Sequence, residues 1–285
     1  MENFQKNRHL SELPPVLTAH LFPIVGAKLL DLLKNLTPKD WNCTAVKQWT
    51  VKDLATHLLD TNLRRLSIGR DGYFGESFHG GSPEEFRAFL GELNHSWVKA
   101  TRRLSPRVLC HFLAVSDDEL FQYFSSLDPN KPAAFGVSWA GEDESMTWFD
   151  VAREYTEKWH HQQQMREALG KPGIMTEELY GPVLDVFVRA LPHTYRNVHA
   201  AAGTKIGFHV SGVGGGTWLL ARNADYWLLK KDSDSTAQCR ISIPSDLAWK
   251  LFTNGLSEQE ARSALSVEGD AKLAEPAYST RAIAT

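Results

Sequence analysis

Two histidines and one glutamate have the side-chain types and the spacing from which a metal site can be built. Glu157 and His161 are four residues apart, so on a helix they are neighbours and can bind one ion together. His57 lies in another segment, at the edge of an apolar stripe, where it can point into a cavity between helices. This ligand set is typical of catalytic zinc sites, whose open fourth position acidifies a bound water or thiol.

The same spacing also allows a simpler interpretation. His57 can be a boundary histidine with one hydrogen bond, and the Glu157–His161 pair can lie on a polar helix face that contacts solvent. Gln164 falls on that face, within about 60° of both residues, whereas His160 points about 100° away from His161. If the face is covered, we expect Gln164 and His160 to lie behind the ligands as supporting contacts.

These residues lie on segments whose patterns predict amphipathic helices. Apolar residues three and four positions apart predict helices over 17–36, 50–68, 82–103, 105–127 and 147–169. Thr50, Ser82 and Ser105 are the expected N-caps, and Gly170 ends the longest helix. Long helices joined by loops indicate an up-and-down four-helix bundle, a fold that builds ligand sites from facing helices.

After about residue 173 the pattern changes to short β-type segments. Strands are expected over 205–210, 217–221, 226–230 and 238–243, and helices over 176–191 and from Ser245, Ser257 and Asp270. The glycines of 212–216 lack the Lys-Ser/Thr ending of a phosphate-binding loop and lie between two strands, so a hairpin loop is expected. We therefore predict a helical domain over 1–173 and an α+β domain over 174–285.

Composition excludes several classes of protein. The 285 residues carry 31 Lys+Arg against 34 Asp+Glu, a balance that disfavours a general nucleic-acid or anionic-membrane binder. The three cysteines are far apart and form no CxxC pair, which argues against a disulfide framework or a thiolate zinc ribbon. No signal peptide is recognisable in the charged N-terminal segment, and no apolar run is long enough to span a membrane. A cytoplasmic protein with a small-molecule partner is expected.

Three segments, in order along the chain, match the pattern of a known family. QWTVKDLATHLLD resembles a W-[ST]-V-x-D-x-x-x-H-L segment, and EKWHHQQQMREALG resembles an E-x-x-x-H-x-x-D-x-x-x-A-x-G helix, in register from Glu157 to Gly170. Both are found in the mycothiol-dependent maleylpyruvate isomerase family, part of the wider DinB-like metalloenzyme superfamily. LSEQEARSALSVEGDAKLAEP resembles that family's second domain, a small α+β module similar to sterol-carrier proteins.

The resemblance implies a DinB-like four-helix bundle followed by a sterol-carrier-protein-like α+β domain. It implies a divalent metal, typically zinc, held by His57, Glu157 and His161. In the family, the open metal position is thought to activate a low-molecular-weight thiol such as mycothiol, whose thiolate adds to an electrophilic substrate. The expected function is therefore a metal-dependent and thiol-dependent isomerase or transferase acting on a small electrophile, similar to maleylpyruvate isomerase.

One residue departs from the family pattern. Gln164 stands where the family has Asp, and a glutamine can hydrogen-bond a metal ligand but cannot act as a carboxylate base. This substitution therefore bears on whether the chain catalyses the specific maleylpyruvate reaction, and not on whether it binds the metal. Two other functions remain open at this point: a non-catalytic small-molecule-binding protein with a structural metal, and a metal-assisted hydrolase in which water replaces the thiol.

Overall fold

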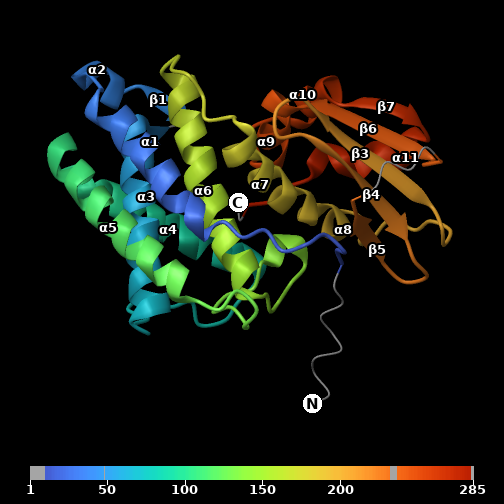
Figure 1. The fold of residues 1–285 in the computed structure, drawn as a ribbon, viewed down its shortest axis with the longest axis horizontal. Coiled ribbons are helices and arrows are strands. Elements are labelled where there is room, and N and C mark those ends of the chain that lie inside the picture. The colour runs from blue at the N-terminus through green and yellow to red at the C-terminus, as the bar shows by residue number, and fades with distance from the viewer. Residues whose placement is uncertain (1–9, 48, 232–235, 284–285) are drawn as a thin grey trace. The chain divides into compact units, whose positions relative to one another are not determined.

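The chain combines a helical amino-terminal region with a carboxy-terminal sheet, as expected. The computed structural model describes residues 10–47, 49–231 and 236–283, so the beginning of the segment in which no signal peptide was recognised lies outside it (Figure 1). Two compact units interleave along the chain. One consists of Leu17–Asp128 and Glu154–Ile174, and the other of Met1–Val16, Pro129–Arg153 and Met175–Thr285. The boundary after residue 173 between consecutive domains stays a prediction.

The first unit is built from helices. They are α1 (Phe22–Lys34), α2 (Pro38–Trp41), α3 (Val51–Arg65), α4 (Pro83–Thr101), α5 (Pro106–Ser126) and, from Glu154 onward, α6 (Thr147–Ala168). A short antiparallel pair, β1 (Thr44–Val46) and β2 (Trp49–Thr50), precedes α3 and was not predicted. At its other end α3 continues into a π-helical turn, Leu66–Arg70.

Local capping determines where these helices begin. Thr50 accepts a hydrogen bond from the Asp53 backbone N–H (3.2 Å), and the Asp53 carboxylate accepts one from the Thr50 N–H (3.0 Å). Ser82 and Glu85 form the same capping box at α4, and the Ser105 hydroxyl caps α5. Each cap satisfies N–H groups that have no partner inside the helix. The predicted N-caps are therefore confirmed.

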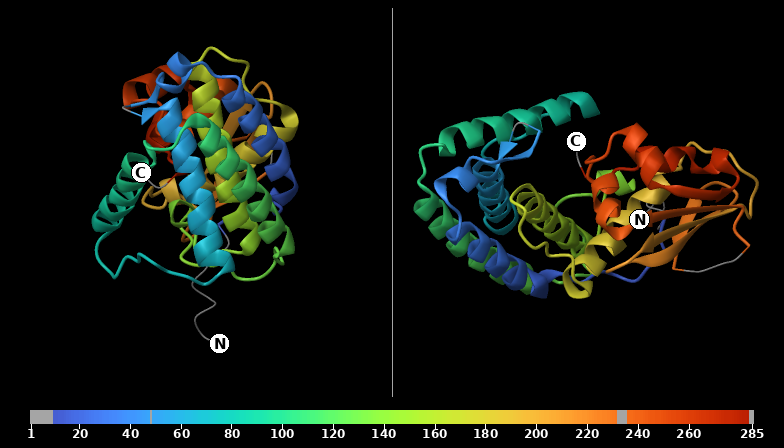
Figure 2. Two further views of the ribbon diagram at one scale, coloured as in Figure 1. Left: turned by 90° about the vertical axis from the view of Figure 1, so that its left-hand side faces the viewer. Right: turned by 90° about the horizontal axis from the view of Figure 1, so that it is seen from above.

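Packing in this unit places α6 among the other helices. α5 contacts both α1 and α3, whereas α4 contacts α3 and lies at the margin of the unit (Figure 2). The Gln162 side chain donates to the Val25 carbonyl of α1 (2.9 Å), and Arg166 donates to the Lys28 carbonyl (2.8 Å). Apolar Trp159 and polar Gln162 are both buried. The polar residues of α6 therefore do not form an ordinary solvated face.

The second unit contains a five-stranded sheet of order β5-β4-β3-β6-β7, in which only β3 and β6 are parallel. Its strands are β3 (Lys205–Ser211), β4 (Gly216–Arg222), β5 (Trp227–Lys230), β6 (Cys239–Pro244) and β7 (Ser266–Gly269). Its helices, besides the first turns of α6, are α7 (Glu177–Phe187), α8 (Leu191–Thr194), α9 (Ser245–Phe252), α10 (Glu258–Ala264) and α11 (Ala271–Ala274).

Most predicted elements of this unit are present, with two differences. The glycine run forms the loop of the β3–β4 hairpin, as predicted. The helix expected from Asp270 into the tail is wrong in its length, because α11 ends at Ala274 and a 3₁₀ segment follows. β7 was not predicted. No helix of the described part of the chain has the length and apolar character needed to cross a membrane.

Candidate metal centre

His57 is held in place by the start of α3. It lies two turns after the Thr50–Asp53 capping box, and only 7% of its side chain is exposed. The Trp49 ring packs edge-on against the imidazole, with 5.2 Å between ring centroids. Its Nδ1 atom is buried and has no hydrogen-bond partner among the described residues, so the ring's polar contact is made by Nε2.

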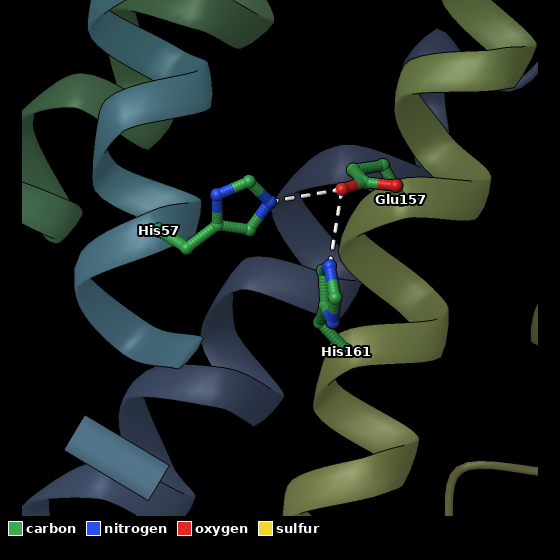
Figure 3. A group of neighbouring side chains, drawn as sticks. All are labelled: His57, Glu157 and His161. Atoms are coloured by element: carbon green, nitrogen blue, oxygen red, sulfur yellow. Dashed lines mark hydrogen bonds and ion pairs between the residues drawn. The ribbon is translucent and has the colours of Figure 1, made fainter. Parts of the chain in front are cut away.

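Glu157 and His161 lie one turn apart on α6 and face His57 (Figure 3). The Glu157 Oε1 atom is 3.0 Å from His57 Nε2 and 3.0 Å from His161 Nε2. The three candidate ligand atoms lie within 4.8 Å of one another. The structure thus brings together the three residues that the sequence singles out, from segments 100 positions apart.

The hydrogen bond made by His161 fixes which of its nitrogens carries a proton. Its Nδ1 atom is 2.8 Å from the Gln164 Oε1 atom, and because a carbonyl oxygen only accepts, Nδ1 is the donor. In neutral His161 the Nε2 lone pair therefore points at a Glu157 oxygen. Two acceptors at 3.0 Å repel each other unless a proton or a cation lies between them. This donor set fits a metal ion.

The electrostatics favour the protonation states that bind metals. Burial lowers the pKa of His57, in spite of its hydrogen bond to Glu157, and thus favours the neutral imidazole. Burial by itself raises the pKa of Glu157, but the neighbouring His161, His160 and His57 side chains hold that pKa well below its usual value. A neutral imidazole beside an ionised carboxylate is the form in which these groups bind divalent ions.

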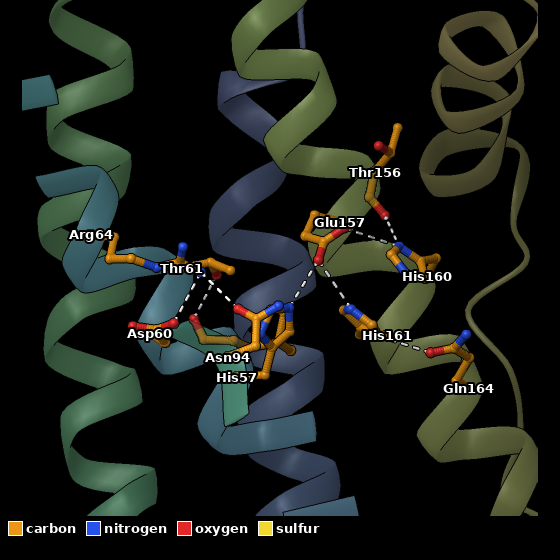
Figure 4. Close-up of polar contacts among 11 residues, drawn as sticks. His57, Asp60, Thr61, Arg64, Asn94, Thr156, Glu157, His160, His161 and Gln164 are labelled. Carbon is orange, nitrogen blue, oxygen red and sulfur yellow. Dashed lines mark hydrogen bonds and ion pairs between the residues drawn. The ribbon is translucent and has the colours of Figure 1, made fainter. Parts of the chain in front are cut away.

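His160 packs beside His161 and Glu157. Its Nδ1 atom donates to the Thr156 carbonyl (3.0 Å) and is 3.7 Å from the second oxygen of Glu157 (Figure 4). Its ring centroid is 4.0 Å from that of His161. Burial lowers the pKa of His160 to about 3, so the ring is neutral near pH 7. His160 and Gln164 thus both contact His161, Gln164 by a hydrogen bond and His160 by ring packing.

Sequence reasoning missed other polar residues of this region. Asp60 and Arg64 follow His57 along α3, and Asn94 of α4 contacts Arg64 (Figure 4). Asp60 and Arg64 follow His57 by three and seven residues, and residues at this spacing share one face of a helix. The sequence could therefore have indicated that they lie near His57. Asn94 comes from a separate helix, and no local pattern links it to the others.

Comparisons with known proteins give one family and two similar solved structures. The family model described as the mycothiol maleylpyruvate isomerase N-terminal domain matches residues 22–166, just over half of the chain. No curated protein sequence matches the chain. The crystal structure of the mycothiol-dependent maleylpyruvate isomerase has 12% identity over 88% of this chain and 91% of its own, with a TM-score of 0.49. A mutant of that name, with alanine in place of a histidine, has 11% identity over 94% and 96%, also with a TM-score of 0.49. By the extent of the family match, the chain belongs to the mycothiol maleylpyruvate isomerase family, a family of enzymes.

Proposed function

We propose that this protein is a metal-dependent and thiol-dependent isomerase or thiol transferase that acts on a small electrophilic substrate. The single observation that carries the proposal is the convergence of two imidazole Nε2 atoms on one Glu157 oxygen. Membership of an isomerase family supports the reaction class. A divalent ion, with zinc as the expected one, would be held by His57, Glu157 and His161 and would lower the pKa of a thiol bound at its open position.

The chain's own residues prepare this centre in distinct ways. Gln164 keeps the His161 proton on Nδ1 and so directs the Nε2 lone pair at the ion position. Glu157 brings negative charge, and its position between the two histidines sets the spacing of the donors. No fourth His, Cys, Asp or Glu joins the three among the described residues. That supports a catalytic centre with an exchangeable position over a closed structural one.

The thiol cofactor and the reaction remain part of the proposal. The family model and the similar solved structure are both named for mycothiol, which supports a low-molecular-weight thiol of that kind. When bound, such a thiol would supply a thiolate nucleophile that can add reversibly to a conjugated double bond, which allows isomerisation by rotation about that bond with no net change in atoms. In a transfer reaction the adduct would instead take up the thiol proton and be released as a thioether.

We also propose the finer architecture and location. Helices α1, α3, α5 and α6 would form the DinB-like four-helix bundle, supported by the contacts of α5 with α1 and α3 and by the side-chain bonds of α6. Residues 174–285 would form the sterol-carrier-protein-like domain. The cysteines at 43, 110 and 239 are free thiols, which supports a reducing, cytoplasmic environment.

Metal content is the first test. The protein is purified without a polyhistidine tag, and metals are measured by elemental mass spectrometry beside His57→Ala and His161→Ala. His111→Ala, which removes an exposed histidine of α5, is the matched control. We expect about one divalent ion per chain in the wild type and the control, and its loss in both ligand variants. A folded wild-type protein that holds no metal and takes up no added zinc would contradict the proposal.

Thiol dependence is the second test. The zinc-loaded protein is assayed with small conjugated electrophiles, with and without an added low-molecular-weight thiol. We expect turnover only when the thiol is present. Turnover without thiol would instead indicate metal-assisted hydrolysis, and metal binding without any turnover would favour a binding protein.

A further inference from the structure

A pocket lies in the helical unit between the end of α1, α2 and the first turns of α5. Its volume is about 520 Å³, within the range of about 300–1,000 Å³ that is usual for small-molecule sites. Leu33 of α1, Trp41 of α2 and Cys110 of α5 line it, and all three are buried. Of the described residues, none from α3 or α6 lines it, so the pocket is separate from the candidate metal centre.

Small side chains on α5 leave this space open. Helices α1 and α5 lie side by side (Figure 1). Cys110 and Ala114 are one turn apart on α5 and both line the pocket, where larger side chains would fill the gap between the helices. Trp41 belongs to the same core cluster as Leu33 and Cys110. Burial raises the pKa of the Cys110 thiol, so this group is neutral near pH 7 and the inner part of the pocket is apolar and uncharged.

The exposed side chains that line the pocket are, in contrast, basic. Lys34, Arg107 and His111 are exposed, and no Asp or Glu is among the described residues that line the pocket. Neither Lys34 nor Arg107 forms an ion pair within the described part of the chain. Exposed arginines elsewhere in this unit do have such partners: Arg70 pairs with Glu119, and Arg87 pairs with Glu84. The pocket therefore combines an apolar interior with two cations that no carboxylate of the chain neutralises.

We propose that this pocket binds a small amphiphilic anion, a molecule with an aromatic body and one acidic head group. The aromatic body would pack on Trp41 and Leu33, where removal of apolar surface from water supplies affinity. The head group would meet Lys34 and Arg107, whose charge-assisted hydrogen bonds favour an anion over a neutral analogue. This inference goes beyond the proposed function and does not depend on it, because binding here needs neither the metal nor the thiol.

The first part of the test concerns charge. Anilinonaphthalene sulfonate is the probe, and phenylnaphthylamine, which has the same rings without the sulfonate, is its neutral analogue. Both are titrated by fluorescence into the zinc-loaded wild type and into a Lys34→Gln/Arg107→Gln double variant. A Lys99→Gln/Arg87→Gln double variant is the matched control, because it removes the same two charges from exposed positions of α4. We expect sulfonate affinity to fall about five- to tenfold in the first variant only, with affinity for the neutral analogue unchanged.

The second part of the test concerns shape. Ala114→Phe places a ring in the pocket and should weaken binding of both probes about tenfold or more, since it fills the space that their aromatic bodies need. Ala100→Phe, the same change at an exposed position of α4, is the control. Circular dichroism checks that each variant is folded. The charge variant changes only exposed side chains, so it decides the question even if Ala114→Phe fails to fold.

The two parts together give a pattern that other binding sites would not produce. Unchanged sulfonate affinity in the Lys34→Gln/Arg107→Gln variant would overturn the inference, as would an equal loss in either control variant. A folded Ala114→Phe protein that binds both probes like the wild type would overturn it too, because the probes would then bind elsewhere. None of these outcomes affects the proposed reaction, which is tested separately by metal content and by thiol dependence.

Discussion

A single oxygen of Glu157 lies between two imidazole nitrogens, so the chemistry of this centre depends on how each imidazole is oriented. His161 can offer a lone pair there only because Gln164 holds the proton on the other ring nitrogen. His57 has no such support, since its Nδ1 atom is buried without a partner. The two histidines are therefore unequal, and the orientation of His161 is the one that an outer contact determines.

This inequality leads to a prediction for Gln164. Gln164→Leu removes the acceptor of the His161 Nδ1 proton, so the ring can turn or change its tautomer, and zinc affinity should fall about 10- to 100-fold. Gln164→Glu keeps an acceptor and should bind zinc at least as tightly as the wild type. Affinity is measured by competition with a chromogenic chelator. Gln122→Leu, which changes an exposed glutamine of α5, is the control. Equal affinity of Gln164→Leu and wild type would show that Gln164 does not orient His161.

At the scale of elements, a buried polar cluster links the helices that carry the site. Asp117 of α5 pairs with Lys158 of α6 and accepts a hydrogen bond from Asn62 of α3 (2.7 Å). Gly26 of α1 makes room for the same carboxylate, since an added Cβ would be 3.0 Å from its Oδ2 atom. Lys158 directly follows Glu157 in sequence, so this cluster sets the rotation of α6 that turns Glu157 toward His57.

Lys158 should therefore be sensitive to substitution. Only 4% of its side chain is exposed, and Lys158→Met leaves the Asp117 carboxylate buried without its cation, which should cost about 3–5 kcal/mol of unfolding free energy. Adding Asp117→Leu should recover most of that loss, because the two polar groups then disappear together. Urea unfolding of the single and double variants measures the coupling. Arg87→Met breaks an exposed pair with Glu84 and should change nothing measurable. Additive losses in the double variant would exclude the pair as a coupled unit.

A helix or strand is easier to predict from the sequence when the residues that stabilise it lie only a few positions away along the chain. The starts of α3, α4 and α10 were predictable because Thr50, Ser82 and Ser257 bond to residues three positions away. The strand β7 and the pair β1–β2 have two to four residues each, too few to show a period, and they exist because of their partners. The same contrast applies to the site: the Glu157–His161 spacing is local, whereas the contact of Arg64 with Asn94 is not.

The glycine run gives a second prediction at this scale. A Cβ on Gly215 would be 2.2 Å from the Val210 carbonyl oxygen, a backbone atom that cannot move aside. Gly215→Ala should therefore destabilise the β3–β4 hairpin, by about 1–3 kcal/mol in thermal or urea unfolding. Gly91→Ala, in α4, meets nothing within 4 Å and should be neutral or slightly stabilising. If Gly215→Ala were as stable as the wild type, another explanation for this glycine would be required.

At the scale of the whole molecule, the interleaved division brings the two ends of the chain into one unit. The segment before α1 pairs with β5, the edge strand of the sheet: the Glu12 N–H donates to the Leu229 carbonyl (2.8 Å), and the Leu229 N–H donates to the Leu10 carbonyl (2.9 Å). An edge strand covered in this way cannot pair with another molecule. No pattern in the first residues predicted this role, because the partner strand is more than 200 positions away.

Arg189 also contacts the segment that precedes α1. It donates to the Ser11 hydroxyl (3.3 Å) and to the Pro14 carbonyl (2.6 Å), and its guanidinium lies 4.7 Å from the centre of the Trp148 ring. Burial lowers the pKa of Arg189 to about 10, which still leaves it charged at pH 7. Without the segment, this buried cation would lose two acceptors and keep the Asp185 carbonyl, at a cost in free energy that adds to the exposure of the β5 edge.

Deleting residues 1–15 should therefore lower the thermal unfolding temperature and increase self-association, because the Ser11 and Pro14 acceptors of Arg189 and the segment that pairs with β5 are all removed. Differential scanning calorimetry and multi-angle light scattering measure the two effects. Deleting residues 1–9 alone leaves both sets of contacts in place and is the matched control. We expect the longer deletion to form larger species as concentration rises while the shorter one behaves as the full chain. Equal behaviour of all three proteins would mean that the segment lies on the sheet without stabilising it, and that the β5 edge is protected by other means.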